Sequence, residues 1–111
     1  RIGMRDQFIM ILITAPSQEV GMQIANVLIE GKLAACVNTL APIKSLFRWE
    51  GKVSTDEEVL LLVKSRASLF EDRLVPAVLE VHPYDVPEII ALPILMGSQD
   101  YLDWIIDETS P

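Results

Sequence analysis

The chain has 111 residues, a formal net charge of −7 and a hydrophobic fraction of 50%. Its length favours a single domain, and so apolar a composition excludes intrinsic disorder. The acidic balance argues against non-specific binding of nucleic acid, the absence of an apolar run of about 18 residues argues against a membrane span, and the single cysteine excludes an intrachain disulfide.

Residues 1–111 are therefore expected to form one domain in a reducing, cytoplasmic compartment, with neither nucleic acid nor a membrane as a partner. Arg1-Ile2-Gly3 precedes a methionine, and we expect these three residues to be a remnant in front of a natural start at Met4. This stretch is too short and too polar for a secretory signal.

The first elements are a buried strand and an amphipathic helix. Residues 8–13 form a short, isoleucine-rich apolar run, which fits a strand covered on both faces. Ser17 is a suitable N-cap for a helix in which apolar residues recur every three or four positions up to Leu28. Gly31 offers a left-handed stop at the C-terminal end of this helix.

A long β-hairpin is predicted next. Residues 33–49 form an irregular strand, with Pro42 at a bulge or an unpaired edge position because proline cannot donate to a ladder. Glu50-Gly51 predicts a short turn, after which the chain returns antiparallel. Residues 59–63 are apolar at every position, so neither face at the centre of this second strand is polar.

A second helix follows the hairpin. Ser68 and Glu71 match the spacing of a capping box, and apolar residues then keep helical spacing as far as Val81. Pro76 interrupts this pattern, because an interior proline removes a hydrogen bond and clashes with the preceding turn. We therefore expect a kink at Pro76.

The last third of the chain predicts a loop at residues 82–87, a short strand at residues 88–92 and a final helix that starts at Gly97-Ser98. The complete order is β-α-β-β-α-β plus a C-terminal helix, which is the pattern of an α+β, ferredoxin-like fold. Right-handed connections place both main helices on one face of the antiparallel sheet.

The second face of this sheet needs a cover. The strands at residues 8–13 and 59–63 are apolar on both sides, so an uncovered face would expose more than the few hundred Å² that monomers usually tolerate. The C-terminal helix is too small to cover it alone. The sequence therefore predicts a tightly packed homo-oligomer.

Six short motifs follow one another along the chain at characteristic spacing: Thr14-Ala15-Pro16, residues 33–38, Trp49-Glu50-Gly51-Lys52, Glu58-Val59 leading to Lys64, residues 82–89, and Tyr101-Leu102-Asp103-Trp104. Together, from about Phe8 to Ile106, they resemble the CutA family, which is named for divalent-cation tolerance. The resemblance implies a ferredoxin-like fold, a very stable homotrimer similar in architecture to PII-type signalling proteins, and copper binding. It implies no settled catalytic activity.

His82 and Cys36 are the candidate metal ligands. In the best-known bacterial form of the family, copper is attributed to a cysteine before the Thr-Ala-Pro turn and to a His-His pair; here these positions are Ile13 and Val81-His82. Imidazole binds copper well, but His82 could instead be a loop histidine bonded to the backbone or to water. Cys36 could equally be a small hydrophobic residue of a strand.

A second candidate site is a cleft between subunits. Its expected lining residues are Trp49, Glu58, Lys64, Tyr84, Glu88 and Tyr101. Such a cleft could hold a small anionic or polar ligand, or the same residues could simply form the interface, where Trp and Tyr are enriched. The carboxylates of residues 56–58 could attract a hard cation, or form only a solvated entrance to the strand.

The sequence offers no machinery for an enzyme. It contains no Gly-x-Ser-x-Gly elbow, no cysteine with an evident histidine and acid beside it, and no glycine-rich phosphate loop. We expect a non-catalytic homotrimer without an organic cofactor that binds copper or other divalent metal ions. The alternatives are a PII-like regulatory module that binds a small metabolite in intersubunit clefts, and a purely structural trimer.

Overall fold

The computed structural model describes residues 6–111, so the expected remnant at residues 1–3 lies outside the described residues. The elements are β1 (Phe8–Ala15), α1 (Gln18–Glu30), β2 (Cys36–Trp49), β3 (Lys52–Arg66), η1 (Ala67–Leu69), η2 (Phe70–Leu74), α2 (Val75–Val81), β4 (Ile89–Pro93) and α3 (Gln99–Glu108). Within this part of the chain, no helix is long and apolar enough to cross a membrane.

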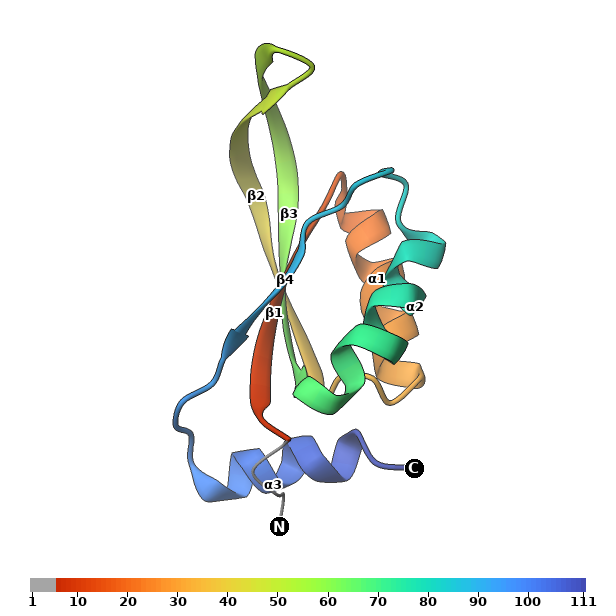
Figure 1. Ribbon diagram of the computed structural model, residues 1–111, viewed down its shortest axis with the longest axis vertical. Coiled ribbons are helices and arrows are strands. Elements are labelled where there is room, and N and C mark those ends of the chain that lie inside the picture. Colours follow the sequence, from red (N-terminus) through yellow and green to blue (C-terminus); the bar gives the residue numbers. More distant parts are fainter. Residues whose placement is uncertain (1–5) are drawn as a thin grey trace.

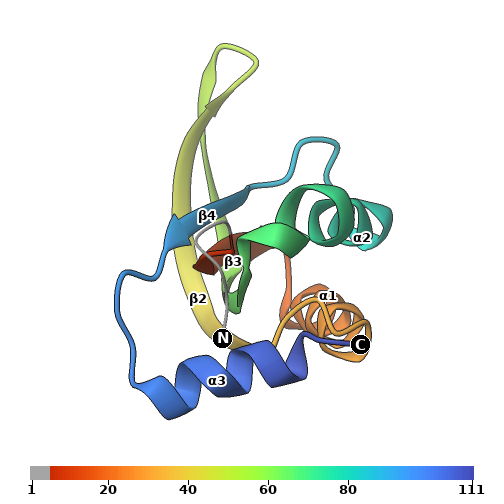
Figure 2. The same cartoon turned by 60° about the horizontal axis from the view of Figure 1, so that its bottom comes forward.

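The four strands form one antiparallel sheet in the order β2-β3-β1-β4. Helices α1 and α2 pack side by side on one face of this sheet, whereas α3 lies across the end of the sheet away from the hairpin tip (Figures 1 and 2). This arrangement confirms the predicted α+β, ferredoxin-like fold with an extra C-terminal helix.

The core lies between the sheet and the two main helices. Alternate residues of β1, namely Ile9, Ile11 and Ile13, are buried on the helix side, and α1 contributes Ile24 and Leu28. Each such side chain stabilises the fold by roughly 1.5–3 kcal/mol when it is fully buried. The N-cap predicted for α1 is confirmed, because the Ser17 hydroxyl accepts a bond from the Val20 amide.

The opposite face of the sheet, here called the outer face, is also largely apolar. Because residues directly opposite each other in an antiparallel ladder share a face, the register assigns these residues to it: Met10, Leu12, Thr14, Cys36, Asn38, Leu40, Leu60, Leu62, Lys64, Ile90 and Leu92. Ile90 and Leu40 are about half exposed. The apolar character predicted for both sides of β1 and β3 is therefore present, and one chain leaves its outer face only partly covered.

The β2–β3 hairpin extends well beyond the rest of the molecule (Figure 1). The predicted irregularity at Pro42 is confirmed as a bulge: Leu40 pairs with Leu60 and Ile43 with Glu58, so that Ala41 and Pro42 together face a single residue. Beyond the bulge, residues 43–58 form what we call the hairpin arm. At its tip Glu50 and Gly51 both have positive φ, 52° and 78°, as a tight hairpin turn requires.

The end of α1 differs from the prediction. Gly31 has a φ of −80°, and the left-handed residue is Lys32, with a φ of 57°. A Cβ at Gly31 would lie 3.0 Å from the carbonyl oxygen of Val27, a close approach that the backbone would have to relieve. The expectation of a left-handed stop at Gly31 was thus wrong by one residue.

The capping box predicted at Ser68 was also wrong. The helical segment opens with a 3₁₀ turn that begins at Ala67, and no side chain of its own caps it. The Ser68 amide instead donates to the carboxylate of Asp6, 62 residues earlier in the chain, over 3.2 Å. Asp6 also forms an ion pair with Arg66, so a distant carboxylate takes the place of the local cap.

Pro76 lies where the helix changes type. The five residues of η2 before it form a π-helical turn, in which the Val75 amide donates to the Phe70 carbonyl, and regular α-helix begins at Val75. A wide turn of this kind suits a proline, which has no amide hydrogen to donate and needs space for its ring. The interruption expected at Pro76 is therefore a change of hydrogen-bond pattern.

Candidate functional site

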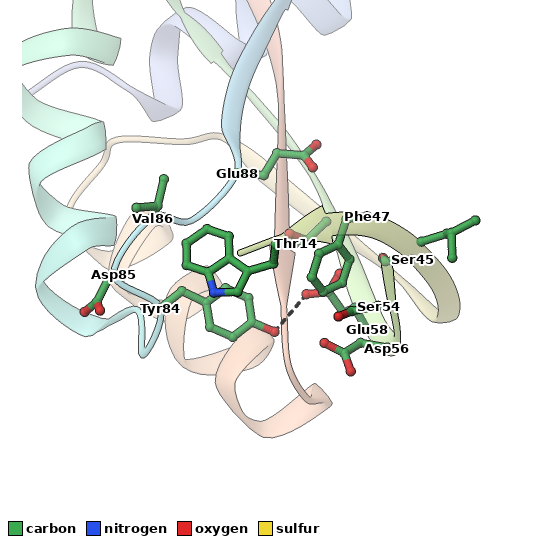
Figure 3. A pocket seen from close by; sticks show the side chains of 12 residues that line it. Thr14, Ser45, Phe47, Ser54, Asp56, Glu58, Tyr84, Asp85, Val86 and Glu88 are labelled. Atoms are coloured by element: carbon green, nitrogen blue, oxygen red, sulfur yellow. Dashed lines mark hydrogen bonds between the residues drawn. The ribbon is translucent and has the colours of Figure 1, made fainter. Parts of the chain in front are cut away.

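A cleft of about 720 Å³ lies between the hairpin arm and the loop that leads from α2 to β4 (Figure 3). We call it the acidic cleft. It is lined by Thr14, Ser45, Leu46, Phe47, Trp49, Ser54, Asp56, Glu58, Tyr84, Asp85, Val86 and Glu88. Four of these residues carry carboxylates, and in the described part of the chain no lysine or arginine belongs to the lining.

A hydrogen bond between Tyr84 and Glu58 joins the two walls of the acidic cleft. The Tyr84 hydroxyl donates to Glu58 Oε2 over 2.8 Å, and Glu58 is only 8% exposed (Figure 3). Burial raises the pKa of Tyr84 to about 12, with a further contribution from the hydrogen bond and the charge of Glu58. The phenol thus stays protonated and available as the donor.

His82 positions the start of the same loop. Its Nδ1 accepts a bond from the Tyr84 amide at 3.1 Å, so its Nε2 carries the hydrogen and donates to the Thr14 carbonyl at 2.8 Å. The ring is 7% exposed and lies against the Tyr84 ring, with centroids 4.8 Å apart. Both nitrogens therefore have backbone partners, as in the alternative of a loop histidine bonded to the backbone.

Cys36 lies at the opposite end of the sheet. It faces Lys64 across the β2–β3 ladder, and both side chains form hydrogen bonds to the Asn38 amide oxygen. Burial, together with the nearby Cys36, raises the pKa of Tyr101. Cys36 is half-buried on the outer face, so it is not part of the core beneath the helices.

The six residues predicted for a cleft thus fall into two groups within one chain. Trp49, Glu58, Tyr84 and Glu88 line the acidic cleft, whereas Lys64 and Tyr101 lie near Cys36. Glu58 and Lys64 share a strand face, as expected, but six residues along a strand separate them by about 20 Å. Only a second chain could bring the two groups together.

Sequence reasoning missed several residues of the acidic cleft. Phe47 and Ser45 alternate with Trp49 along one face of β2, and Asp56 and Ser54 lie opposite them on β3. Their common face could have been found from the alternation and the position of the tight turn. Asp85 and Val86 lie in an irregular loop, for which the sequence holds no comparable periodic signal.

Comparisons with known proteins agree with this fold. The family model described as "CutA1 divalent ion tolerance protein" matches residues 9–108. The chain belongs to the CutA1 family. The divalent-cation tolerance protein CutA of Thermus thermophilus is 50% identical over 99 residues, which cover 89% of this chain and 95% of the relative.

Two further relatives extend the CutA comparison. The chloroplastic CutA protein of Arabidopsis thaliana is 48% identical over 101 residues. The aligned region covers 91% of this chain but only 55% of that longer protein. The crystal structure of CutA1 from Oryza sativa matches with a TM-score of 0.90 and 46% identity, over 94% of both chains. The CutA resemblance noted in the sequence is therefore confirmed.

The residues of this CutA protein do not reproduce the copper site that the family resemblance implies. Ile13, at the expected cysteine position, is fully buried in the core, and the nitrogens of His82 are occupied by backbone groups. Within residues 6–111, no three His, Cys, Asp or Glu side chains gather so that they could hold a metal ion. Four carboxylates line the acidic cleft, and carboxylate oxygens are ligands that hard divalent cations prefer.

Proposed function

We propose that this CutA protein is a non-catalytic, homotrimeric divalent-cation tolerance protein, and that its cations bind at the acidic cleft. The observation that carries the proposal is that Asp56, Glu58, Asp85 and Glu88 all line one cleft without a lysine or arginine in its described lining. Oxygen ligands of this kind bind divalent cations, and the Irving–Williams order makes Cu²⁺ the tightest of the first-row series.

Assembly is an integral part of this proposal. One chain supplies no group of three ligands within residues 6–111, so a neighbouring chain would have to complete each cation site. The outer face gives copies of this chain a reason to associate, because Ile90 and Leu92 expose apolar area on β4, an edge strand of the sheet. Three copies are proposed from the resemblance to the CutA family.

The proposed location is the cytoplasm. The chain has a single cysteine, Cys36, which forms no intrachain disulfide and therefore suits a reducing compartment. Fractionation of cells that produce the protein, with detection by an antibody, tests this part of the proposal. Recovery in a membrane or an exported fraction would contradict it.

Titration calorimetry with Cu²⁺, Zn²⁺ and Mn²⁺ tests the cation site. We expect Glu58→Gln to weaken Cu²⁺ binding at least about tenfold, as loss of a group that supports a metal site does. Asp107→Asn is the matched control, because Asp107 is an exposed carboxylate on α3 outside the cleft. His82→Ala tests the histidine: unchanged affinity would exclude it as a ligand. Equal affinities for the wild type and Glu58→Gln would refute the cleft as the cation site.

A second candidate function is that of a PII-like module that binds a small metabolite. The size of the cleft favours it, because about 720 Å³ lies within the range of small-molecule sites. The apolar and aromatic part of the lining points the same way, with Phe47, Trp49 and Val86 facing the cleft. Its carboxylates favour a cationic ligand over the anionic one that the sequence left open.

A further inference from the structure

The acidic cleft contains a largely buried carboxylate whose second oxygen remains accessible to solvent. Glu58 is 8% exposed and accepts a bond from Tyr84 at Oε2, whereas Oε1 has no hydrogen bond to residues 6–111 and is not among the fully buried polar atoms. The Glu58 side chain lines the cleft (Figure 3). A buried carboxylate in this state attracts a hydrogen-bond donor that carries positive charge.

The remaining lining groups of the acidic cleft are also suited to a cation. Phe47 and Trp49 expose their rings, Trp49 by 54%, and the faces of aromatic rings attract positive charge. Lys52, which pairs with Trp49 across the hairpin, is not among the residues that line the cleft. Aromatic rings cannot ligate a divalent metal ion, so they indicate an organic cation.

The carboxylates lie on both walls of the cleft. Asp56 and Glu58 belong to the hairpin arm, whereas Asp85 and Glu88 belong to the loop, and the Tyr84 ring lies between Asp85 and Asp56 in Figure 3. We propose that the acidic cleft binds a linear aliphatic polyamine, with one ammonium group on each wall and the methylene chain against the rings between them. A protonated amine donates to Glu58 Oε1, which a quaternary ammonium group cannot do.

This inference deepens the second candidate function, since it names the class of metabolite. It is distinct from the metal proposal, although Glu58 takes part in both, because the two cations need different arrangements of groups in the cleft. A polyamine uses the aromatic surface together with two separated carboxylate groups, whereas a metal ion needs several oxygens around one point.

Titration calorimetry of the assembled protein with spermidine, at an ionic strength of about 0.15 M, tests the proposal. We expect saturable binding that Glu58→Gln weakens at least tenfold, and that the control Asp107→Asn leaves unchanged. Trp49→Leu removes an exposed ring and keeps the charges, so it should weaken binding while the fold is retained. Butylamine, which has one ammonium group, should bind at least tenfold more weakly than spermidine.

Three results would overturn the proposal. Absence of saturable binding would do so, as would equal affinities for the wild type and Glu58→Gln, or equal affinities for spermidine and butylamine. A lysine side chain of a neighbouring copy is the competing occupant; in that case spermidine would not bind and Glu58→Gln would loosen the assembly. Titration of the same samples with Cu²⁺ separates the two functions, because metal binding that persists without spermidine binding refutes only the polyamine.

Discussion

Tyr84 donates a 2.8 Å hydrogen bond to Glu58, and so connects the loop that follows α2 with the last residue of the hairpin arm. The two residues are 26 positions apart in the chain. The bond fixes the separation of the two walls of the acidic cleft at one point. Its removal should therefore change both stability and cleft geometry.

We predict that Tyr84→Phe lowers the free energy of unfolding by about 1 kcal/mol, because a charged acceptor that is almost buried loses its donor. Urea unfolding at neutral pH measures the change. A double-mutant cycle with Glu58→Gln isolates the interaction between the two side chains. A coupling energy near zero would contradict a direct contribution of this bond.

The ionisation of Tyr84 gives a prediction for alkaline pH. Folding raises the pKa of this phenol from its ordinary value of 10.0 to about 12, so the unfolded chain loses the proton first as the pH rises. The resulting stabilisation is complete below pH 10 and is lost between about pH 10 and pH 12. Unfolding measured across this interval should show the loss, and Tyr84→Phe should reduce its size.

His82→Ala should destabilise the protein by about 2 kcal/mol, because it leaves the Thr14 carbonyl and the Tyr84 amide without their partners. Thermal unfolding measures this loss. Amide hydrogen exchange of the non-proline loop residues, Tyr84, Asp85, Val86 and Glu88, should become faster, since the ring that holds the loop is gone. Unchanged exchange in the loop would show that His82 does not position it.

Ile90→Asp should prevent assembly, because it introduces a charge into the outer face. Sedimentation velocity should then show a smaller species than the wild type. Met22→Asp is a suitable control: Met22 is 48% exposed, close to the 49% of Ile90, but lies on α1 away from the outer face. Equal sedimentation of Ile90→Asp and the wild type would exclude this face as the interface.

Lys32→Gly should stabilise the protein by about 1 kcal/mol, because glycine adopts the positive φ of 57° without the steric cost that a lysine bears. Gly31→Ala should destabilise it, since the new Cβ would lie 3.0 Å from the Val27 carbonyl oxygen. Chemical unfolding of the two variants distinguishes these roles. Stabilisation by Gly31→Ala would contradict the close approach.

Local patterns were sufficient to predict most of the fold. The continuous apolar run of residues 8–13 identified β1 as a strand with two apolar faces, and the missing amide of Pro42 indicated the irregularity in β2. Helical spacing and Ser17 located α1 correctly. These features depend on neighbours in the chain, and their physical cause is therefore visible in a short stretch of sequence.

Features that depend on distant contacts could not be predicted in this way. The amide of Ser68 donates a hydrogen bond to Asp6, and no local sequence pattern indicates a partner 62 residues away. Similarly, Glu58 and Lys64 share one strand face, yet only the distance along the strand shows that they belong to different ends of the sheet. The loop residues Asp85 and Val86 line the cleft only because of the three-dimensional course of the loop, which no sequence pattern indicates.

The hairpin arm links occupancy of the cleft to association of the chains. The part of β3 before Val59 pairs with β2 alone, and a ribbon of two strands is only marginally stable in water. A molecule in the cleft and a neighbouring copy would each order the hairpin arm. Binding of either one therefore lowers the entropic cost of binding the other. By thermodynamic reciprocity, a ligand that tightens the assembly must itself bind more tightly to the assembly, and by the same factor.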